Sequence, residues 1–100
     1  MVGKGGFVYI ITNKNNTTLY TGITSDLTSR LIQHIEKLFP KSFSAKYNLN
    51  KLVYFENYQS IEKAIEREKQ IKAGSRAKKI MLIEAINPTW DDLGVEVLKW

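Results

Sequence analysis

The stretch Phe7–Thr24, FVYIITNKNNTTLYTGIT, decides the fold of this chain. Both of its ends are rich in β-branched and aromatic residues, and a polar, Asn-rich run at 13–18 separates them. Two β-prone runs around such a turn predict an antiparallel hairpin, with Tyr9 and Tyr20 on neighbouring strands. The predicted strands are residues 7–12 and 19–24.

A helix is predicted after the hairpin, starting at a Ser25 or Asp26 cap and ending at about Leu38, before Pro40. Its apolar residues recur at helical spacing. They are Leu27, Leu31, Ile35 and Leu38. A polar loop, 41–50, and a third strand, 52–58, follow.

Two more helices are predicted in the second half of the chain. The first is capped by Ser60 and ends at Gly74, and the second starts at Ser75 and closes at Asn87-Pro88. The apolar residues of the last helix are expected to be buried. They are Ile80, Met81, Leu82, Ile83 and Ile86.

The predicted order is therefore β-β-α-β-α-α, an α+β fold in which helices flank a small three-stranded antiparallel sheet. One hundred residues suffice for one domain, 1–100, with its core at about 5–88. The tail 89–100 is expected to dock through Trp90, Leu93 and Trp100, and its alternating apolar residues also admit a short strand.

Composition narrows the possible functions. The chain has no cysteine and one histidine, which excludes disulfides, thiolate sites and His-rich zinc sites. No Ser stands in a nucleophile-elbow context, which argues against acyl transfer. No run is long and apolar enough for a membrane, so we expect a cytoplasmic protein without a membrane partner.

The net charge is +5, and basic residues gather late in the chain. Such a cluster indicates either a polyanion partner, nucleic acid being the commonest, or an ordinary solvated face, and charge alone favours neither. The cluster consists of Lys69, Lys72, Arg76, Lys78 and Lys79.

Glu68 gives the sharpest chemical signal. At roughly 100° per residue it falls within the apolar stripe of its helix, about 20° from Ile61. A core-facing carboxylate is costly unless it is paired or binds a metal. The alternative is a glutamate at the rim of the stripe that bridges to Arg30 or to a lysine.

Arg30 and His34 lie four residues apart and share a helix face. A guanidinium can grip phosphate oxygens at two points, and a neutral imidazole can relay a proton. An exposed Arg and a space-filling His remain the alternative. A Tyr9 or Tyr20 base would need a nearby cation or metal, because a phenol ionises near pH ~10.

The ordered set Val8-Tyr9-Ile10, Tyr20-Thr21-Gly22, Arg30 and Glu68 resembles the GIY-YIG nuclease superfamily. The likeness is greatest to its small stand-alone URI or UPF0213-type members, and it covers about residues 5–93. Further motifs support this likeness. They are Ala64–Lys72, Arg76–Lys79 and Asn87–Trp90.

This resemblance implies a DNA endonuclease that hydrolyses phosphodiester bonds with one divalent ion, Mg²⁺ or Mn²⁺. It assigns the metal to Glu68 and the remaining catalytic roles to Tyr9, Tyr20, Arg30 and His34, without fixing which of these is the base. The basic cluster would bind DNA.

The chain departs from the family pattern at several points. Its motifs read VYI and YTG, and Ile23 and Thr24 stand where many members carry a lysine. There is no room for a second, target-choosing domain, so DNA shape (branches or nicks) or a protein partner would supply specificity, as in repair or recombination. A nucleic-acid-binding module that does not cut, and an adaptor domain of a repair complex, are the alternatives.

Overall fold

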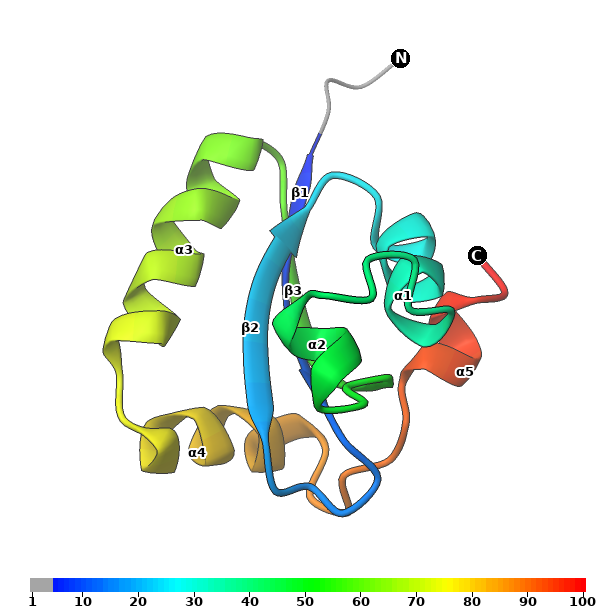
Figure 1. The fold of residues 1–100 in the computed structure, drawn as a ribbon. Coiled ribbons are helices and arrows are strands. Elements are labelled where there is room, and N and C mark those ends of the chain that lie inside the picture. The colour runs from blue at the N-terminus through cyan, green and yellow to red at the C-terminus, as the bar shows by residue number, and fades with distance from the viewer. Residues whose placement is uncertain (1–4) are drawn as a thin grey trace.

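The computed structural model describes residues 5–100, and residues 1–4 lie outside that part. Its centre is an antiparallel sheet in the order β2-β1-β3 (Figure 1). The predicted α+β class and the predicted sheet are confirmed. The strands are β1 (Gly6–Thr12), β2 (Leu19–Thr24) and β3 (Lys51–Tyr58).

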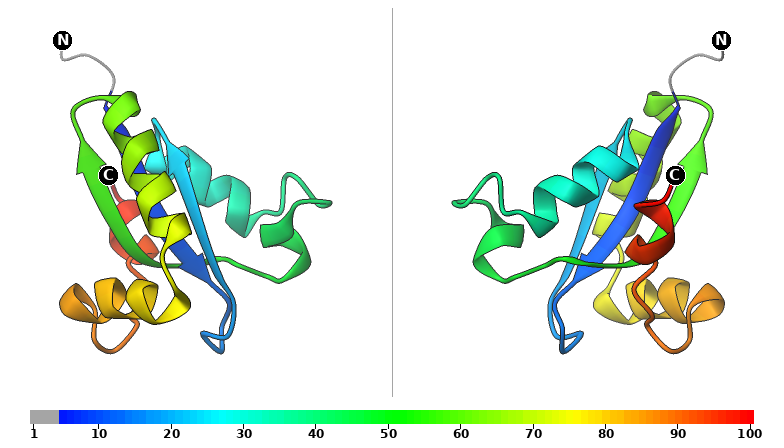
Figure 2. Two further views of the ribbon diagram at one scale, coloured as in Figure 1. Left: turned by 90° about the vertical axis from the view of Figure 1, so that its left-hand side faces the viewer. Right: turned by 90° about the vertical axis from the view of Figure 1, so that its right-hand side faces the viewer.

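Helices cover both faces of the sheet. In Figure 2, α3 lies in front of the sheet in the left view and behind it in the right view, whereas α1 and α5 do the opposite. The helices are α1 (Leu27–Ile35), α2 (Phe43–Lys46), α3 (Ile61–Ala73), α4 (Arg76–Ile86) and α5 (Gly94–Val97).

The central strand β1 supplies side chains to two separate cores, because successive side chains of a strand point to opposite faces. One core lies under α3 and α4, and the other lies under α1 and α5. The first contains Val8, Ile10, Val53, Ala64, Ile71 and Ile83. The second contains Tyr9, Ile11, Leu27, Leu31, Leu52 and Val97. Burial on both faces explains why β1 is apolar almost throughout rather than alternating.

The region after α1 differs from the prediction. Helix α1 ends at Ile35, not near Leu38, and Lys37 adopts a left-handed conformation with φ 53°. The predicted loop 41–50 contains the one-turn helix α2, whose Ser42 cap accepts a hydrogen bond from Ala45 N at 3.2 Å. Four residues are too few to show a helical period, so the sequence pattern could not reveal α2.

The prediction for the buried side of α4 was right in part, since Ile80 and Leu82 are partly buried. Ile83 is fully buried, but Met81 is 70% exposed and Ile86 is 62% exposed. Helix α4 lies at one end of the sheet rather than flat upon it (Figure 1), so only a narrow strip of the helix reaches the core. Gly74 ends α3 in an extended conformation, not in the left-handed one common at helix ends.

The C-terminal segment packs along β3. Leu93 N donates to Leu52 O at 2.7 Å, and the amide of the buried Asn87 donates to Val53 O at 3.0 Å. The short strand that the alternating apolar residues of 93–97 allowed does not form. Helix α5 lies there instead, and its Val97 is 1% exposed. The Trp100 ring lies against those of Phe7 and Phe55.

The two faces of α4 should respond differently to truncation. We expect Ile83→Ala to lower the free energy of unfolding by about 2–4 kcal/mol, because it opens a cavity in the core. The matched control Met81→Ala, on the exposed face, should change it by less than about 0.5 kcal/mol. Urea denaturation checks both values, and equal losses would contradict this packing of α4.

Candidate active site

Tyr9 lies at the centre of the candidate site and is almost completely buried. It pairs across the hairpin with Gly22, and its ring covers that residue so closely that a Cβ there would lie 2.5 Å from the phenol oxygen. Glycine at position 22 is therefore required by Tyr9 itself. Burial raises the pKa of Tyr9 and the Arg30 charge opposes this, so the phenol keeps its proton at neutral pH.

Tyr20 is the outer phenol of the pair. Its ring centre lies 6.5 Å from that of Tyr9 and 6.1 Å from that of His34, and Tyr20 is only partly buried. The hairpin thus places one phenol inside and the other at the surface.

Helix α1 brings Arg30 and His34 onto the Tyr9 oxygen. Asp26 caps this helix by accepting a hydrogen bond from Ser29 N at 3.1 Å, which fixes where its turns fall. Arg30 Nε donates to Tyr9 Oη at 3.3 Å, and His34 Nε2 lies 2.8 Å from the same oxygen. The sequence placed these two residues on one face, and the structure joins them through one phenol.

His34 is neutral at physiological pH. It is 6% exposed, and burial followed by the nearby Arg30 charge lowers its pKa from 6.5 to about 4. A neutral imidazole has one nitrogen free to accept a proton. Its Nδ1 lies 2.9 Å from Ser44 Oγ on α2, a contact that no sequence pattern indicated.

Glu68 reaches the site from α3, across the β2 edge. Its side chain is 15% exposed and forms an ion pair of 2.9 Å with Lys72, so the predicted alternative of a bridge to a lysine describes what the structure contains. The ammonium of Lys72 lies 5.8 Å from the centre of the Tyr20 ring. The Glu68 charge also raises the pKa of Tyr9 slightly, through space.

The residues present suit one hydrated divalent ion. No group of three or more His, Asp or Glu side chains gathers anywhere in residues 5–100, so an ion on Glu68 would not be enclosed by protein ligands alone. Mg²⁺ is commonly held by one or two carboxylates, with water and substrate phosphate completing its shell. In the structure the Lys72 ammonium occupies this position, so a metal ion bound to Glu68 would have to displace it.

A hollow of about 300 Å³ opens next to Tyr20. Its walls combine two aromatic rings with two cations. The lining residues are Leu19, Tyr20, Thr21, Phe43, Lys72 and Lys79. Phe43 stacks on Tyr20 with ring centres 6.2 Å apart, and Tyr47 lies 4.7 Å from Phe43. Both outer rings are exposed, so they offer a face to a ligand.

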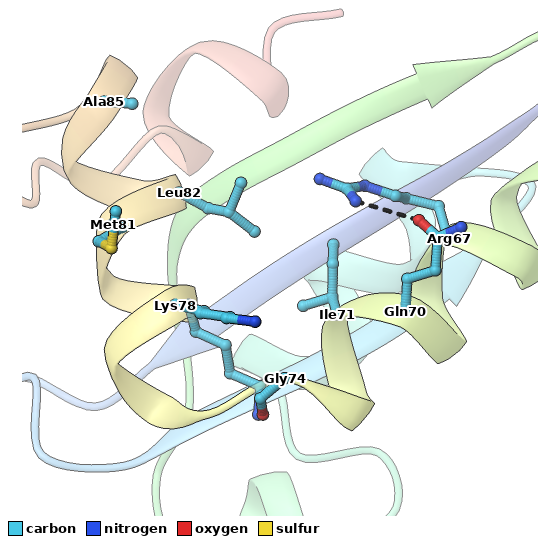
Figure 3. Close-up of a pocket in the computed structure, with 9 residues that line it drawn as sticks. Arg67, Gln70, Ile71, Gly74, Lys78, Met81, Leu82 and Ala85 are labelled. Atoms are coloured by element: carbon cyan, nitrogen blue, oxygen red, sulfur yellow. Dashed lines mark hydrogen bonds between the residues drawn. The ribbon is translucent and has the colours of Figure 1, made fainter.

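A larger hollow, of about 470 Å³, lies between α3 and α4 (Figure 3). It is mainly apolar and contains none of the five candidate catalytic residues. Its members are Arg67, Gln70, Ile71, Gly74, Lys78, Lys79, Met81, Leu82 and Ala85. Since Arg67 pairs with Glu56 of β3 at 2.9 Å, this hollow lies on the other flank of α3 from Glu68.

The predicted basic cluster is divided by this arrangement. Lys72 and Lys79 line the hollow beside Tyr20, whereas Lys78 lines only the one between α3 and α4. Lys69 is exposed on α3, and Arg76 donates to Asn16 O of the hairpin turn at 3.4 Å.

Sequence reasoning missed a second polar cluster, on β3. The Glu56 carboxylate accepts hydrogen bonds from Tyr54, Tyr58 and Arg67. Its pKa is lowered because these hydrogen bonds outweigh the effect of burial, whereas burial and Glu56 raise that of Tyr54 to about 12. The spacing of Tyr54, Glu56 and Tyr58 at every second position was the available signal, since it puts all three on one strand face.

A hairpin with one tyrosine on each strand, an Arg/His helix and a helix glutamate are the parts of one known class of catalytic domain. The model of the GIY-YIG catalytic domain matches residues 5–81, and the chain belongs to this family. Within the family it is a small member of the UPF0213 type.

The relatives are of similar size to this chain. A UPF0213 protein of Syntrophus aciditrophicus is 36% identical over 78 residues, covering 78% of this chain and 88% of the relative. One of Staphylococcus haemolyticus is 37% identical over 82 residues, covering 78% and 93%. The solution NMR structure of a UPF0213 protein from Bacillus halodurans has a TM-score of 0.56 at 26% identity, covering 88% of this chain and 92% of that one.

The helices within residues 5–100 are too short or too polar for any of them to span a bilayer.

The buried His34 should make stability depend on pH. In the unfolded chain the pKa of His34 is the ordinary one, near 6.5, so the imidazole binds a proton as the pH falls below that value. In the native state its pKa is about 4, so the imidazole stays neutral down to that pH. Stability should therefore fall as pH drops from about 6.5 to about 4 and change little from this cause below that.

The measurement is the free energy of unfolding of wild type and of His34→Gln between pH 4 and pH 8. Because the variant cannot titrate at this position, the difference between the two proteins should shift in favour of the variant as the solution is acidified. A difference that stays constant with pH would contradict a buried, neutral His34.

Proposed function

We propose that this chain is a metal-dependent DNA endonuclease that hydrolyses phosphodiester bonds, selects DNA by its structure and acts in repair or recombination. The observation that supports this most directly is the meeting of Arg30 and His34 on one phenol oxygen, with the Glu68 carboxylate across the β2 edge. Membership of a catalytic domain family points to the same chemistry.

In this proposal the scissile phosphate enters at the β2 edge, between Arg30 and Lys72. Arg30 uses Nε for Tyr9 and one terminal nitrogen for Gln33, at 2.8 Å, and its other N–H groups can hold a phosphate oxygen. Lys72 adds a second positive charge beside Tyr20. Both cations stabilise the charge that develops on the phosphate in the transition state.

A divalent ion on Glu68, Mg²⁺ or Mn²⁺, would supply Lewis-acid charge to the phosphate and the leaving oxygen. The ion pair between Lys72 and Glu68 would then be broken, and the Lys72 ammonium could contact the substrate. Tyr20, as the outer phenol, is placed to orient water or a phosphate oxygen.

Proton removal falls to Tyr9 and His34 acting together. A buried phenol with a raised pKa is not a ready base, but a single water brought in with the substrate phosphate could give Tyr9 a proton while the phenol passes its own to His34 Nε2, 2.8 Å away. Burial is the main cause of the lowered pKa of His34 and the Arg30 charge is the second; the negative phosphate would offset the second. The substrate would thereby strengthen its own base.

Exposed rings beside the site favour DNA with unpaired bases. Phe43 and Tyr47 are 48% and 42% exposed, and the Lys46 ammonium lies 5.5 Å from the Tyr47 ring centre. Bases that have left a duplex stack on such rings, and nearby cations track the backbone. A single-stranded flap presents such bases outright, so flapped DNA should be the best substrate among duplex, nicked, flapped and four-way DNA.

A nucleic-acid-binding module that does not cut is the second candidate. The Glu68–Lys72 ion pair favours it, because a protein cation already neutralises the carboxylate that would hold the metal.

Glu68 distinguishes these two functions. On a panel of duplex, nicked, flapped and four-way DNA with Mg²⁺ or Mn²⁺, Glu68→Gln should reduce cleavage about 100-fold or more while binding survives. Glu66→Gln, an exposed position on the same helix, is the matched control and should cleave normally. Absence of metal-dependent cleavage on every substrate would favour the binding module.

Lys72 and Lys79 should contact backbone phosphates. Replacing both with Gln should weaken binding evenly across sequences and reduce the slope of log K against log salt by about 1.4–1.8, since each phosphate contact contributes roughly 0.7–0.9. The control Lys63→Gln with Lys99→Gln removes the same charge away from the hollow and should leave the slope nearly unchanged. Binding is measured without metal, and equal slopes for the two double variants would refute this placement of the DNA.

A further inference from the structure

The hydrogen bonds around His34 can be given a direction, because a buried O–H or N–H donor needs an acceptor. Within residues 5–100 the Tyr9 oxygen has two polar neighbours, Arg30 Nε and His34 Nε2. Arg30 can only donate. The Tyr9 hydroxyl therefore has a single available acceptor, the Nε2 atom of His34.

The other tautomer of His34, with its proton on Nε2, would leave the Tyr9 hydroxyl without an acceptor. If His34 carried its proton on Nε2 and donated it to Tyr9, that phenol would receive two hydrogen bonds and have nowhere to send its own proton. Tyr9 is 1% exposed, so bulk water does not offer an acceptor. A buried hydroxyl without an acceptor is strongly unfavourable.

Ser44 lies at the other ring nitrogen of His34, Nδ1. With Nε2 accepting, the neutral ring carries its proton on Nδ1, and that N–H donates to Ser44 Oγ at 2.9 Å. The Ser44 hydroxyl can donate in turn to Ser42 Oγ, 3.2 Å away. Ser44 is 5% exposed, so this contact is held inside the protein.

We propose that Ser44 is a positioning residue: its Oγ accepts the hydrogen bond from His34 Nδ1–H and holds the ring with Nε2 directed at the Tyr9 hydroxyl. The four groups form one directed chain, Tyr9 to His34 to Ser44 to Ser42, with Arg30 donating into its first member. Ser44 acts through the imidazole and does not touch the substrate. Its catalytic relevance rests on the proposed nuclease function, whereas the tautomer itself does not.

Helix α2 positions side chains on both sides of the site. It turns Ser44 inward onto His34 and Phe43 outward against Tyr20. One helical turn thus carries both the group that orients the imidazole and a ring that faces the hollow. The proton chain depends on α2 being in place.

The sole histidine makes the tautomer directly measurable. A two-bond ¹H–¹⁵N correlation spectrum of the untagged, ¹⁵N-labelled chain contains one imidazole. At pH 7 we expect a protonated Nδ1 and an unprotonated Nε2. A proton on Nε2 would overturn the proposal.

Variants separate the role of Ser44 from that of Tyr9. Ser44→Ala keeps the Tyr9 hydroxyl and therefore the Nδ1–H tautomer, but the Nδ1–H signal should shift and exchange faster with water because its acceptor is lost. Ser44→Thr keeps the hydroxyl and should resemble wild type. The matched control Ser42→Ala weakens the cap of α2 but leaves the Nδ1 contact, so its Nδ1–H signal should be that of wild type. An Nδ1–H signal unchanged in Ser44→Ala would refute the role of Ser44.

Cleavage kinetics complete the test. Loss of a group that orients a catalytic imidazole should lower kcat by about 10–100-fold, by analogy with the outer partners of metal-bound histidines, with little change in KM. Ser44→Thr should restore it. An unchanged kcat in Ser44→Ala would contradict a positioning role, and if that variant does not fold, the wild-type spectrum and Ser44→Thr still decide.

The two proposals fail separately. An Nδ1–H imidazole in a chain that cleaves no DNA would remove the nuclease function and keep the hydrogen-bond chain. An Nε2–H imidazole in a chain that cleaves DNA with metal would do the reverse.

Discussion

The phenol of Tyr9 is the point on which the candidate site depends. It comes from the central strand, and it lies flat on the sheet only because residue 22 lacks a Cβ. Its oxygen is the meeting place of Arg30 and His34, so it fixes α1 against the hairpin by polar contacts as well as by packing. A buried polar group of this kind stabilises the fold only when its partners are all present, so fold and site share one requirement.

Helix α3 supports this centre from the other face of the sheet. Consecutive residues of α3 point to opposite flanks: Arg67 pairs with Glu56 on β3, and Glu68 reaches towards β2. The Glu56 cluster therefore helps to set where the Glu68 carboxylate lies. The apolar hollow beyond Arg67 belongs to the anchoring flank of the helix and not to the flank that carries the chemistry (Figure 3).

The sequence predicted the three strands and helix α3 well, because their patterns are long enough to read and their ends are marked by turn or cap residues. Strand β2 and helix α3 lie within a residue of their predicted bounds, and the helical period also placed Arg30 and His34 on one face. Helix α2 was not predicted, because a single helical turn shows no period in the sequence. The contact that Ser44 makes from this helix was therefore not predicted either. Met81 was misplaced because burial on α4 depends on the angle at which that helix meets the sheet, which no local pattern contains.

Both tryptophans of the chain, Trp90 and Trp100, belong to the segment that follows α4. The indole of Trp90 donates to Glu84, and that of Trp100 lies against two phenylalanine rings at the far side of the sheet from α3. Tryptophan fluorescence, excited where tyrosine does not absorb, consequently observes the C-terminal segment and not the neighbourhood of Tyr20. An emission change on adding an oligonucleotide would report displacement of that segment, and it should not be interpreted as base stacking.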